Sequence, residues 1–246
     1  MDEIEKLKSE IEELKKINAV KSDLISVSTH QLRTSLSAIK WTLKMFLDGD
    51  LGVLPKEQEE YIKKSYESLE QMTTLVNDTL TLNSTDNAEI VLEFKKTNIV
   101  KLIEDTVFEF SGEAKKKGID LTFLKPEKDF PEINCNVEMT RVILQNLIEN
   151  GLKYNTSLGN VIVSILEKEG EIEITVKDSG IGISKEDQNN IFQRFFRAEN
   201  AKKHDSIGSG LGLYTIKKII GDHRGKISFE SKLGSGTTFF VTLPIN

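Results

Sequence analysis

The sequence predicts a dimeric four-helix bundle, built from an α-helical hairpin with an N-terminal coiled coil, followed by an α+β layer sandwich. Three observations predict this fold class. Residues 1–48 contain neither Pro nor Gly and repeat apolar residues at heptad spacing, which is typical of one long helix. Residues 56–81 repeat apolar side chains every three or four positions, which predicts a second helix. From residue 89 onward, strand patterns mix with helical ones.

The composition of the 246 residues excludes several classes of protein. Lys and Arg number 33 against 39 Asp and Glu, and the net charge of −6 argues against binding to nucleic acid or to an anionic membrane surface. The single cysteine, Cys135, permits no internal disulfide and no cysteine-based metal site. No apolar run reaches the roughly 18 residues of a membrane span, and the chain does not open with a signal peptide. We therefore expect a cytoplasmic chain without direct membrane contact.

The first helix changes character near Asn18. With Ile4 at heptad position a, the a column continues through Ile11, Asn18, Ile25, Leu32, Ile39 and Phe46. Up to residue 20 the apolar seam is narrow, which suits a two-stranded coiled coil over residues 1–20. Beyond it the stripe widens, which suits a bundle of more helices. Asn18 is either a solvated interruption of the seam or a buried polar residue that fixes its register.

A turn at residues 49–55, with Gly at its start and Pro at its end, connects the first helix to the second. A lone hairpin would leave one face of each helix exposed, so we expect a homodimer whose two hairpins form four helices. The polar segment at residues 83–88 indicates a hinge. The domains predicted on this basis are a coiled-coil helix at 1–20, a helical dimerisation domain at 21–84 and an α+β domain at 88–246.

The α+β domain is expected to contain six strands and three helices. The strands are predicted at residues 90–94, 119–124, 161–166, 172–176, 227–231 and 237–243. The helices are predicted at residues 97–117, with Thr97 as the cap and Gly118 after its end, at 137–152 and at 211–222.

His30 falls at heptad position f, on the water-facing side of the first helix. A histidine on a helix surface is by default only a solvated residue. Its neighbours change this interpretation, because Gln31 adjoins it and Thr34 follows one turn later on the same face. The run from His30 to Lys40 resembles the phosphoacceptor box of sensor histidine kinases.

Four further segments of the α+β domain contain residues suited to binding a nucleotide. Asn146 and Asn150 lie four apart on one helical face, and Lys153 and Tyr154 follow them. Carboxamide oxygens suit magnesium and an ammonium group suits phosphate, although ordinary polar residues on an exposed helix would look the same. The three other segments are Asp178 with Gly180 and Gly182, then Arg194 and Arg197, then Gly208, Gly210 and Gly212. A dinucleotide-binding Rossmann motif is excluded, because no strand enters this last glycine run directly.

In this order the four segments resemble the N, G, F and second G boxes of the GHKL ATPases, which have the Bergerat fold. Together with the His30 box, the resemblance to a two-component sensor histidine kinase covers nearly the whole chain. It implies ATP and Mg²⁺ as cofactors, and a response-regulator receiver domain as the partner that takes the phosphoryl group. It also implies a chain that acts in the cytoplasm, whether or not it is the cytosolic part of a longer membrane-bound sensor.

The resemblance also implies roles for individual residues. Asn150 is the expected magnesium ligand, Asp178 reads adenine, and Arg194 and Arg197 meet the phosphates. Asn146, Lys153 and Tyr154 are further nucleotide contacts, and residues 198–209 form a mobile lid closed by the glycines at 208, 210 and 212. Thr237 belongs to a last glycine box behind adenine. In the hairpin, His30 accepts the phosphoryl group, Gln31 orients its ring and Thr34 orients water for dephosphorylation of the partner.

Three positions depart from the family's pattern. Gln31 stands where an acid is usual, so the imidazole loses a charged partner. Ser35 replaces a helix-kinking proline, so we expect the first helix to run without a sharp bend through residues 31–35. Arg224 replaces a glycine, which affects only a helix end.

Two rival functions remain open from the sequence. Gln31 favours an ATP-binding signalling bundle with weak kinase activity, which acts mainly as a docking module or phosphatase. A GHKL ATPase of the gyrase, chaperone or mismatch-repair kind is disfavoured by the His30 box.

Overall fold

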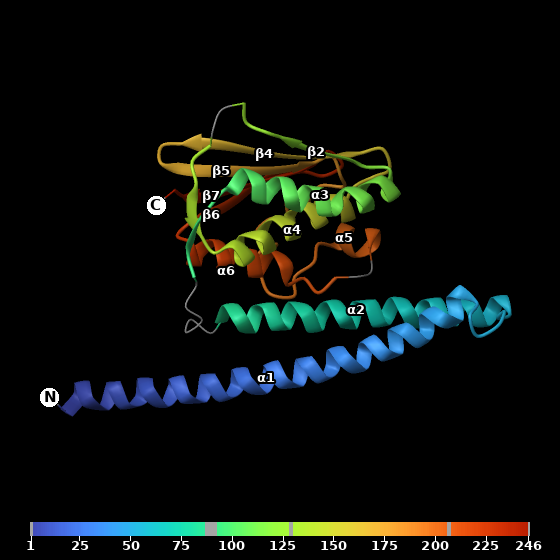
Figure 1. Ribbon diagram of the computed structural model, residues 1–246, viewed down its shortest axis with the longest axis horizontal. Coiled ribbons are helices and arrows are strands. Elements are labelled where there is room, and N and C mark those ends of the chain that lie inside the picture. The colour runs from blue at the N-terminus through green and yellow to red at the C-terminus, as the bar shows by residue number, and fades with distance from the viewer. Residues whose placement is uncertain (1, 87–92, 128–129, 206–207, 246) are drawn as a thin grey trace. The chain divides into compact units, whose positions relative to one another are not determined.

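A computed structural model of the chain describes residues 2–86, 93–127, 130–205 and 208–245. The described chain contains two compact units, a helical hairpin near the N-terminus and an α/β unit made of residues 92–206 and 210–246 (Figure 1). Over the described ranges, no helix is both long enough and apolar enough to cross a membrane.

The hairpin consists of α1, Asp2–Asp48, and α2, Lys56–Asp86. The prediction of one long first helix is confirmed, and the turn follows it as expected, with the Gly52 amide bonded to the Gly49 carbonyl at 3.0 Å. The second helix continues to Asp86, so the hinge predicted from residue 83 is wrong as far as residue 86. Residues 87 and 88 lie outside the described ranges. The polar residues of this segment lower helix propensity only by tenths of a kcal/mol each, and none of them is Gly or Pro.

The hairpin buries little and exposes many apolar side chains. Of its described side chains, Thr29, Leu36 and Leu69 are buried. Half or more of the side-chain surface is exposed at large apolar residues that include Ile17, Leu24, Leu32, Ile39 and Trp41 on α1 and Tyr61 and Met72 on α2. Asn18 is also exposed in the single chain. The a column of the heptad therefore lies partly outside the hairpin's own interface.

Helix α1 runs through residues 31–35 without interruption and curves gradually (Figure 1), as the serine at position 35 predicts. The hydroxyl of Ser35 donates to the Gln31 carbonyl at 3.1 Å, and the hydroxyl of Thr34 donates to the His30 carbonyl at 3.1 Å. Such bonds to the carbonyl four residues back bend helices slightly. The helix around His30 is thus shaped by hydroxyl groups in place of a proline.

The second unit is a layered α/β fold. Its five-stranded sheet has the order β2, β4, β5, β7, β6, in which β2 and β4 are parallel and the other pairs are antiparallel. The strands are β2 Asp120–Leu124, β4 Asn160–Lys168, β5 Glu171–Asp178, β6 Lys226–Lys232 and β7 Gly236–Pro244. Helices α3, Ile99–Lys117, α4, Val137–Lys153, and α6, Gly212–Asp222, lie together along the sheet (Figure 1). The predicted α+β sandwich is confirmed.

Several boundaries differ from the predictions. A short strand β1 lies at Lys95–Thr97 and pairs with β3, Ile133–Cys135, which the sequence patterns did not indicate. Of the strand predicted at 90–94, residues 93 and 94 are not in a strand, and residues 90–92 lie outside the described ranges. Asn98 caps α3 in place of Thr97, because its side-chain oxygen accepts the Lys101 amide at 2.9 Å. Three-residue strands are too short to show a period.

The core of this unit lies between the helices and the sheet. It contains a continuous cluster of buried aliphatic residues, among them Leu144 and Ile148 from α4, Val161 from β4, Ile172 from β5 and Ile216 from α6. Cys135 is buried in the same cluster. The periods of 3.6 and 2 residues seen in the sequence place these side chains on the inner faces.

The turn that ends α6 contains a residue other than glycine in a left-handed backbone conformation. The Gly225 amide donates to the Ile220 carbonyl and the Arg224 amide to the Gly221 carbonyl, the paired bonds of a Schellman motif. Arg224 takes the left-handed position of that motif, at φ +57°, where glycine is strongly favoured. The buried ring of His223 packs inside this turn, with Nδ1 2.8 Å from the Ile219 carbonyl and Nε2 accepting the Asn136 amide at 3.1 Å.

Candidate active site

The first candidate group, His30, lies on the exposed side of α1. Its neighbour Thr29 is buried in the hairpin and donates to the Ile25 carbonyl. Three residues after His30, the guanidinium of Arg33 donates to the Asn77 side-chain oxygen of α2, with an Nη2 distance of 2.8 Å. The bond between Arg33 and Asn77 connects this side of α1 to α2. The imidazole of His30 is therefore presented to solvent, as the heptad register predicted, with Gln31 and Thr34 also exposed.

A half-buried carboxylate, that of Asp178, lies at the end of β5. Its Oδ1 accepts the backbone amides of Gly180 at 2.8 Å and of Thr237 at 3.1 Å. Burial raises the pKa of this carboxyl to about 6, and the two amide bonds offset only part of that rise. The two amides fix the carboxylate's orientation, as a group that reads a ligand's hydrogen-bond pattern requires.

The glycine at 180 is required by the close packing of the backbone beside Asp178. A Cβ atom there would lie 2.2 Å from the Tyr154 carbonyl, so any side chain would force the two segments apart. The same carbonyl accepts the Ile181 amide at 2.9 Å. The end of α4 is thereby fixed to the loop after β5, which also contains Gly182. The structure thus brings Tyr154, Asp178, Gly180 and Thr237 together.

Helix α4 carries the predicted asparagines on one side. Asn146 and Asn150 are both half-buried, and Asn146 donates to the Val142 carbonyl at 3.0 Å. The start of α6 packs closely against this helix, because a Cβ on Gly212 would lie 2.4 Å from the Asn146 side-chain oxygen. Gly212 and the first asparagine therefore belong to one site. Gly210, at φ +73°, lies against the backbone of residues 195 and 196, and Gly208 is half-buried.

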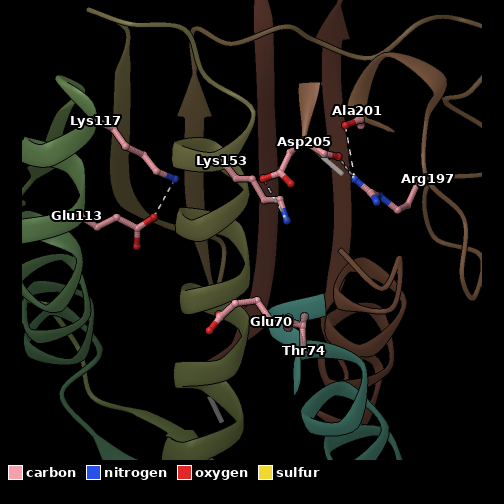
Figure 2. A network of polar contacts seen from close by, with 8 residues as sticks. All are labelled: Glu70, Thr74, Glu113, Lys117, Lys153, Arg197, Ala201 and Asp205. Carbon is pink, nitrogen blue, oxygen red and sulfur yellow. Dashed lines mark hydrogen bonds and ion pairs between the residues drawn. The ribbon is translucent and has the colours of Figure 1, made fainter. Parts of the chain in front are cut away.

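The segment after Arg197 lies across the end of α4. It contains a short helix, α5 Glu199–His204, so the segment predicted as a mobile lid is partly helical. Nη2 of Arg197 donates to the carbonyls of Asp205 and Ala201, and Nζ of Lys153 lies 3.6 Å from the Asp205 carboxylate (Figure 2). Arg194 stacks on the ring of Tyr214, 4.5 Å from its centroid.

Tyr154 links these groups to the loop beside Asp178, through the contacts of its carbonyl with Gly180 and Ile181. Burial raises the pKa of its hydroxyl, and the charge and hydrogen bond of Arg197 lower it in part. The Lys153 ammonium lies 5.8 Å from the centroid of its ring. Lys153, Tyr154 and Arg197 therefore form one cluster, as expected for neighbouring nucleotide contacts.

The residues present fit a magnesium ion that is held mainly by a bound nucleotide. Among the described residues, no group of three or more His, Cys, Asp or Glu side chains could hold a metal ion. Mg²⁺ is commonly held by one or two protein oxygens together with phosphates and water. The side-chain oxygen of Asn150, half-buried on α4, is a ligand of the right chemical class for that arrangement.

Several residues of the site were not predicted from the sequence. Ser231 accepts the Ile183 amide at 2.8 Å and lies 2.9 Å from the Thr237 hydroxyl, which supports the strand behind Asp178. Asn155 is buried and its side chain donates to the Asn160 carbonyl at 2.9 Å. Gln188 donates to the carbonyls of Ile183 and Ser231. Isolated polar residues such as these show no regular spacing in the sequence. Of the three, only Asn155 could have been assigned to the site from the sequence, because it directly follows Tyr154.

Comparison with known proteins gives both domains a family. Residues 20–88 match the His Kinase A (phospho-acceptor) domain, and residues 136–246 match the histidine kinase-, DNA gyrase B- and HSP90-like ATPase. Drug sensory protein A from Synechocystis sp. is 32% identical over 239 residues, which cover 93% of this chain and 36% of that protein. The chain spans between 20% and 45% of the length of the first curated relatives it matches.

Two solved structures share the fold. Full-length ShkA in complex with AMPPNP matches 90% of this chain and 45% of its own, with a TM-score of 0.69 and 24% identity. Histidine kinase ThkA in complex with the response regulator protein TrrA matches 97% of this chain and 66% of its own, with a TM-score of 0.64 and 22% identity. Since the phosphoacceptor and ATPase families both match, in this order and on one chain, the chain belongs to the histidine kinases of two-component sensor proteins.

Proposed function

We propose that the chain binds MgATP in the α/β unit, phosphorylates its own His30, and passes the phosphoryl group to an aspartate of a response regulator. The observation that carries the proposal is that one chain contains both an exposed imidazole on α1 and, in the α/β unit, the half-buried, amide-bound carboxylate of Asp178. The first is available as a nucleophile. The second is oriented to accept a hydrogen bond from the exocyclic amine of adenine. We assign dimerisation and phosphotransfer to residues 21–84 and nucleotide binding to residues 88–246.

In the transfer step, a neutral nitrogen of the His30 imidazole forms a bond to the γ-phosphorus as the bond to the bridging oxygen of ADP breaks. The proton on the other ring nitrogen then passes to solvent, which leaves a phosphohistidine with a neutral ring and a negatively charged phosphoryl group. Positioning and charge neutralisation do most of the work in such reactions, and Mg²⁺ would supply part of the neutralising charge. The carbonyl oxygen of the Gln31 side chain can orient the ring, but it brings no negative charge to the imidazolium.

The hairpin's exposed apolar side chains support a homodimer. Ile17, Leu24, Leu32 and Ile39 are each at least half exposed in one chain, which is costly in water for a long row of aliphatic residues. Pairing with a second hairpin would cover them in a four-helix bundle. The regulator would then take its phosphoryl group from the exposed His30 face, and Thr34, one turn away, would orient water for dephosphorylation of that partner.

A second candidate is a bundle that binds ATP but transfers phosphate weakly and acts mainly as a docking module or phosphatase. Gln31 favours it, because the usual acid is absent. A clamping ATPase of the gyrase kind receives no support from residues 20–88, which match a phosphoacceptor domain.

Incubation with γ-labelled ATP distinguishes these functions. We expect stable label on the protein, acid-labile as phosphohistidine is, and no label on His30→Ala, whose nucleotide affinity should remain near that of the wild type. The matched control is His204→Ala, since His204 is also an exposed histidine. Nucleotide binding without label would favour the second candidate. Release of free phosphate without label would favour the clamping ATPase. Label retained on His30→Ala would overturn the assignment of the acceptor.

A further inference from the structure

Two cations assigned to the nucleotide phosphates already have an acidic residue between them. Lys153 is at the end of α4 and Arg197 precedes α5, and both approach Asp205 (Figure 2). Asp205 contacts the two cations through two different groups, its side-chain carboxylate and its backbone carbonyl. Its carboxylate oxygen lies 3.6 Å from the Lys153 ammonium, and its backbone carbonyl accepts from Nη2 of Arg197.

This arrangement differs from the other ion pair of the same segment. Lys153 and Asp205 keep 14% and 29% of their side-chain surface exposed. Lys202 and Glu199, in contrast, keep 51% and 73%, although their atoms are closer at 2.7 Å. Charge pairs that are partly withdrawn from water are screened less by solvent and salt, so they interact more strongly than exposed ones. Of these two ion pairs, the one at Asp205 is therefore the stronger contact, and it adds to the bond between the Asn200 side chain and the Gly182 carbonyl in holding the segment.

The chemistry of Asp205 imitates that of a phosphate. A carboxylate oxygen beside an ammonium, together with a second oxygen on a guanidinium, satisfies the same donors that phosphate oxygens would satisfy. A bound triphosphate and Asp205 cannot both take these donors in the same geometry. Their competition makes part of the ATP affinity depend on a residue that does not itself bind ATP.

We infer that Asp205 is a latch that occupies the phosphate side of the nucleotide site, fastens residues 198–205 over the end of α4, and is displaced when ATP binds. This inference rests on the proposed function, because it takes Arg197 as a phosphate contact and Lys153 as a neighbouring nucleotide contact, as the family resemblance implies. It adds a determinant of affinity. Loss of the Asp205 carboxylate should leave the adenine contacts at Asp178 unchanged and should release the Lys153 ammonium from its acidic neighbour.

The test compares Asp205→Asn with the matched control Glu199→Gln in the full chain. Both variants remove one acidic charge from the same segment, and only the first removes the contact with Lys153. By calorimetry with AMPPNP and Mg²⁺, we expect Asp205→Asn to bind about three- to tenfold more tightly than the wild type, the effect of a partly buried ion pair. We expect Glu199→Gln to stay within about twofold of the wild type, as an exposed pair should. Asp205→Glu, which keeps the charge, should restore most of the wild-type affinity.

A second measurement separates the latch from simple repulsion between Asp205 and the triphosphate. Without nucleotide, the amides of α5 should exchange with solvent faster in Asp205→Asn than in either the wild type or Glu199→Gln. Equal exchange in all three chains, or an affinity of Asp205→Asn no higher than that of Glu199→Gln, would overturn the inference. Failure of the wild type itself to bind AMPPNP would instead overturn the proposed function, and the exchange comparison would still test the latch.

Discussion

The hairpin and the α/β unit handle their apolar residues in opposite ways. Leu36 and Leu69 are buried between α1 and α2, while Leu32 keeps 52% of its surface exposed. In the α/β unit, aliphatic residues from helices and strands close into one continuous core. The difference teaches that the α/β unit contains its own stabilising interior, whereas the hairpin's interior is incomplete without a second helical pair.

The reacting groups follow the same division. In the hairpin, His30 lies in water, where it can meet either a nucleotide or a partner protein. In the α/β unit, Asp178 is withdrawn from water and held by two amides, where it can distinguish one ligand from another. Under the proposed function, exposure would serve exchange of the phosphoryl group, and partial burial would serve recognition of ATP.

Truncating one leucine in each unit tests this comparison most strongly. Leu144→Ala should lower the free energy of unfolding of the α/β unit by about 2–5 kcal/mol, because it leaves a cavity in a closed core. The matched change Leu32→Ala should cost little in a dilute, monomeric hairpin and more as the protein concentration rises. Denaturation at two concentrations measures both. A concentration-independent loss of the same size in both variants would contradict the difference between the units.

The role of the exposed side of α1 is tested by a substitution at Gln31. Gln31→Glu should speed autophosphorylation, because a carboxylate stabilises the positive charge that develops on the imidazole. We expect a gain below about 10²-fold, since general acid–base assistance of this kind is large only where nothing else holds the ring. Initial rates with γ-labelled ATP measure it, and Gln31→Ala serves as the control that loses both charge and orientation. A rate no higher than that of the wild type would mean that the amide suffices.

The buried side of the comparison is tested by pH. Asp178 has a pKa of about 6, and adenine recognition needs its ionised form, so nucleotide affinity should fall about tenfold between pH 7.5 and pH 5. This pKa lies above the usual value for a carboxyl, so protonation of Asp178 stabilises the folded state as the pH falls from 6 toward 4. The expected loss of nucleotide affinity is therefore not caused by acid unfolding through this residue. Calorimetry of Asp178→Asn, in which this titration is absent, separates it from titration of the phosphates. An equal pH slope in both chains would refute the role.

The smallest effect is expected at the end of α6. Arg224→Gly should stabilise the α/β unit by up to about 1 kcal/mol, because it relieves the left-handed backbone at φ +57° and loses part of that gain to the greater freedom of glycine when unfolded. Arg224→Ala is the control, as it removes the exposed side chain and keeps the strain. Thermal unfolding compares the two. If both variants shift the midpoint equally, the side chain and not the backbone is responsible.

Periodic signals predicted most of the fold. The strands β4, β5, β6 and β7 and the helices α1, α3, α4 and α6 all came from patterns of 2 or 3.6 residues sustained over several turns or alternations. The short strands β1 and β3 did not, because three residues cannot show a period, and their pairing depends on contacts 40 residues apart. The second helix extended beyond its predicted end since a row of polar residues without Gly or Pro does not stop a helix.

The site was predicted in its parts but not in its connections. Spacing and order indicated Asn146, Asn150, Asp178 and the glycines, which the structure places on adjoining segments. The contacts of Asp205 and Ser231 could not be predicted, because one acid in a loop and one serine in a strand are common in any sequence. What makes them matter is the position of their partners in space.

Trp41 carries a practical consequence for every experiment of this kind. The chain contains one tryptophan, and it lies in α1 with 66% of its surface exposed. Its fluorescence therefore reports on the hairpin alone, while far-ultraviolet circular dichroism sums the helices and strands of both units. An emission shift without a change in dichroism would mark association of hairpins, and a dichroism change at constant emission would mark an event confined to the α/β unit.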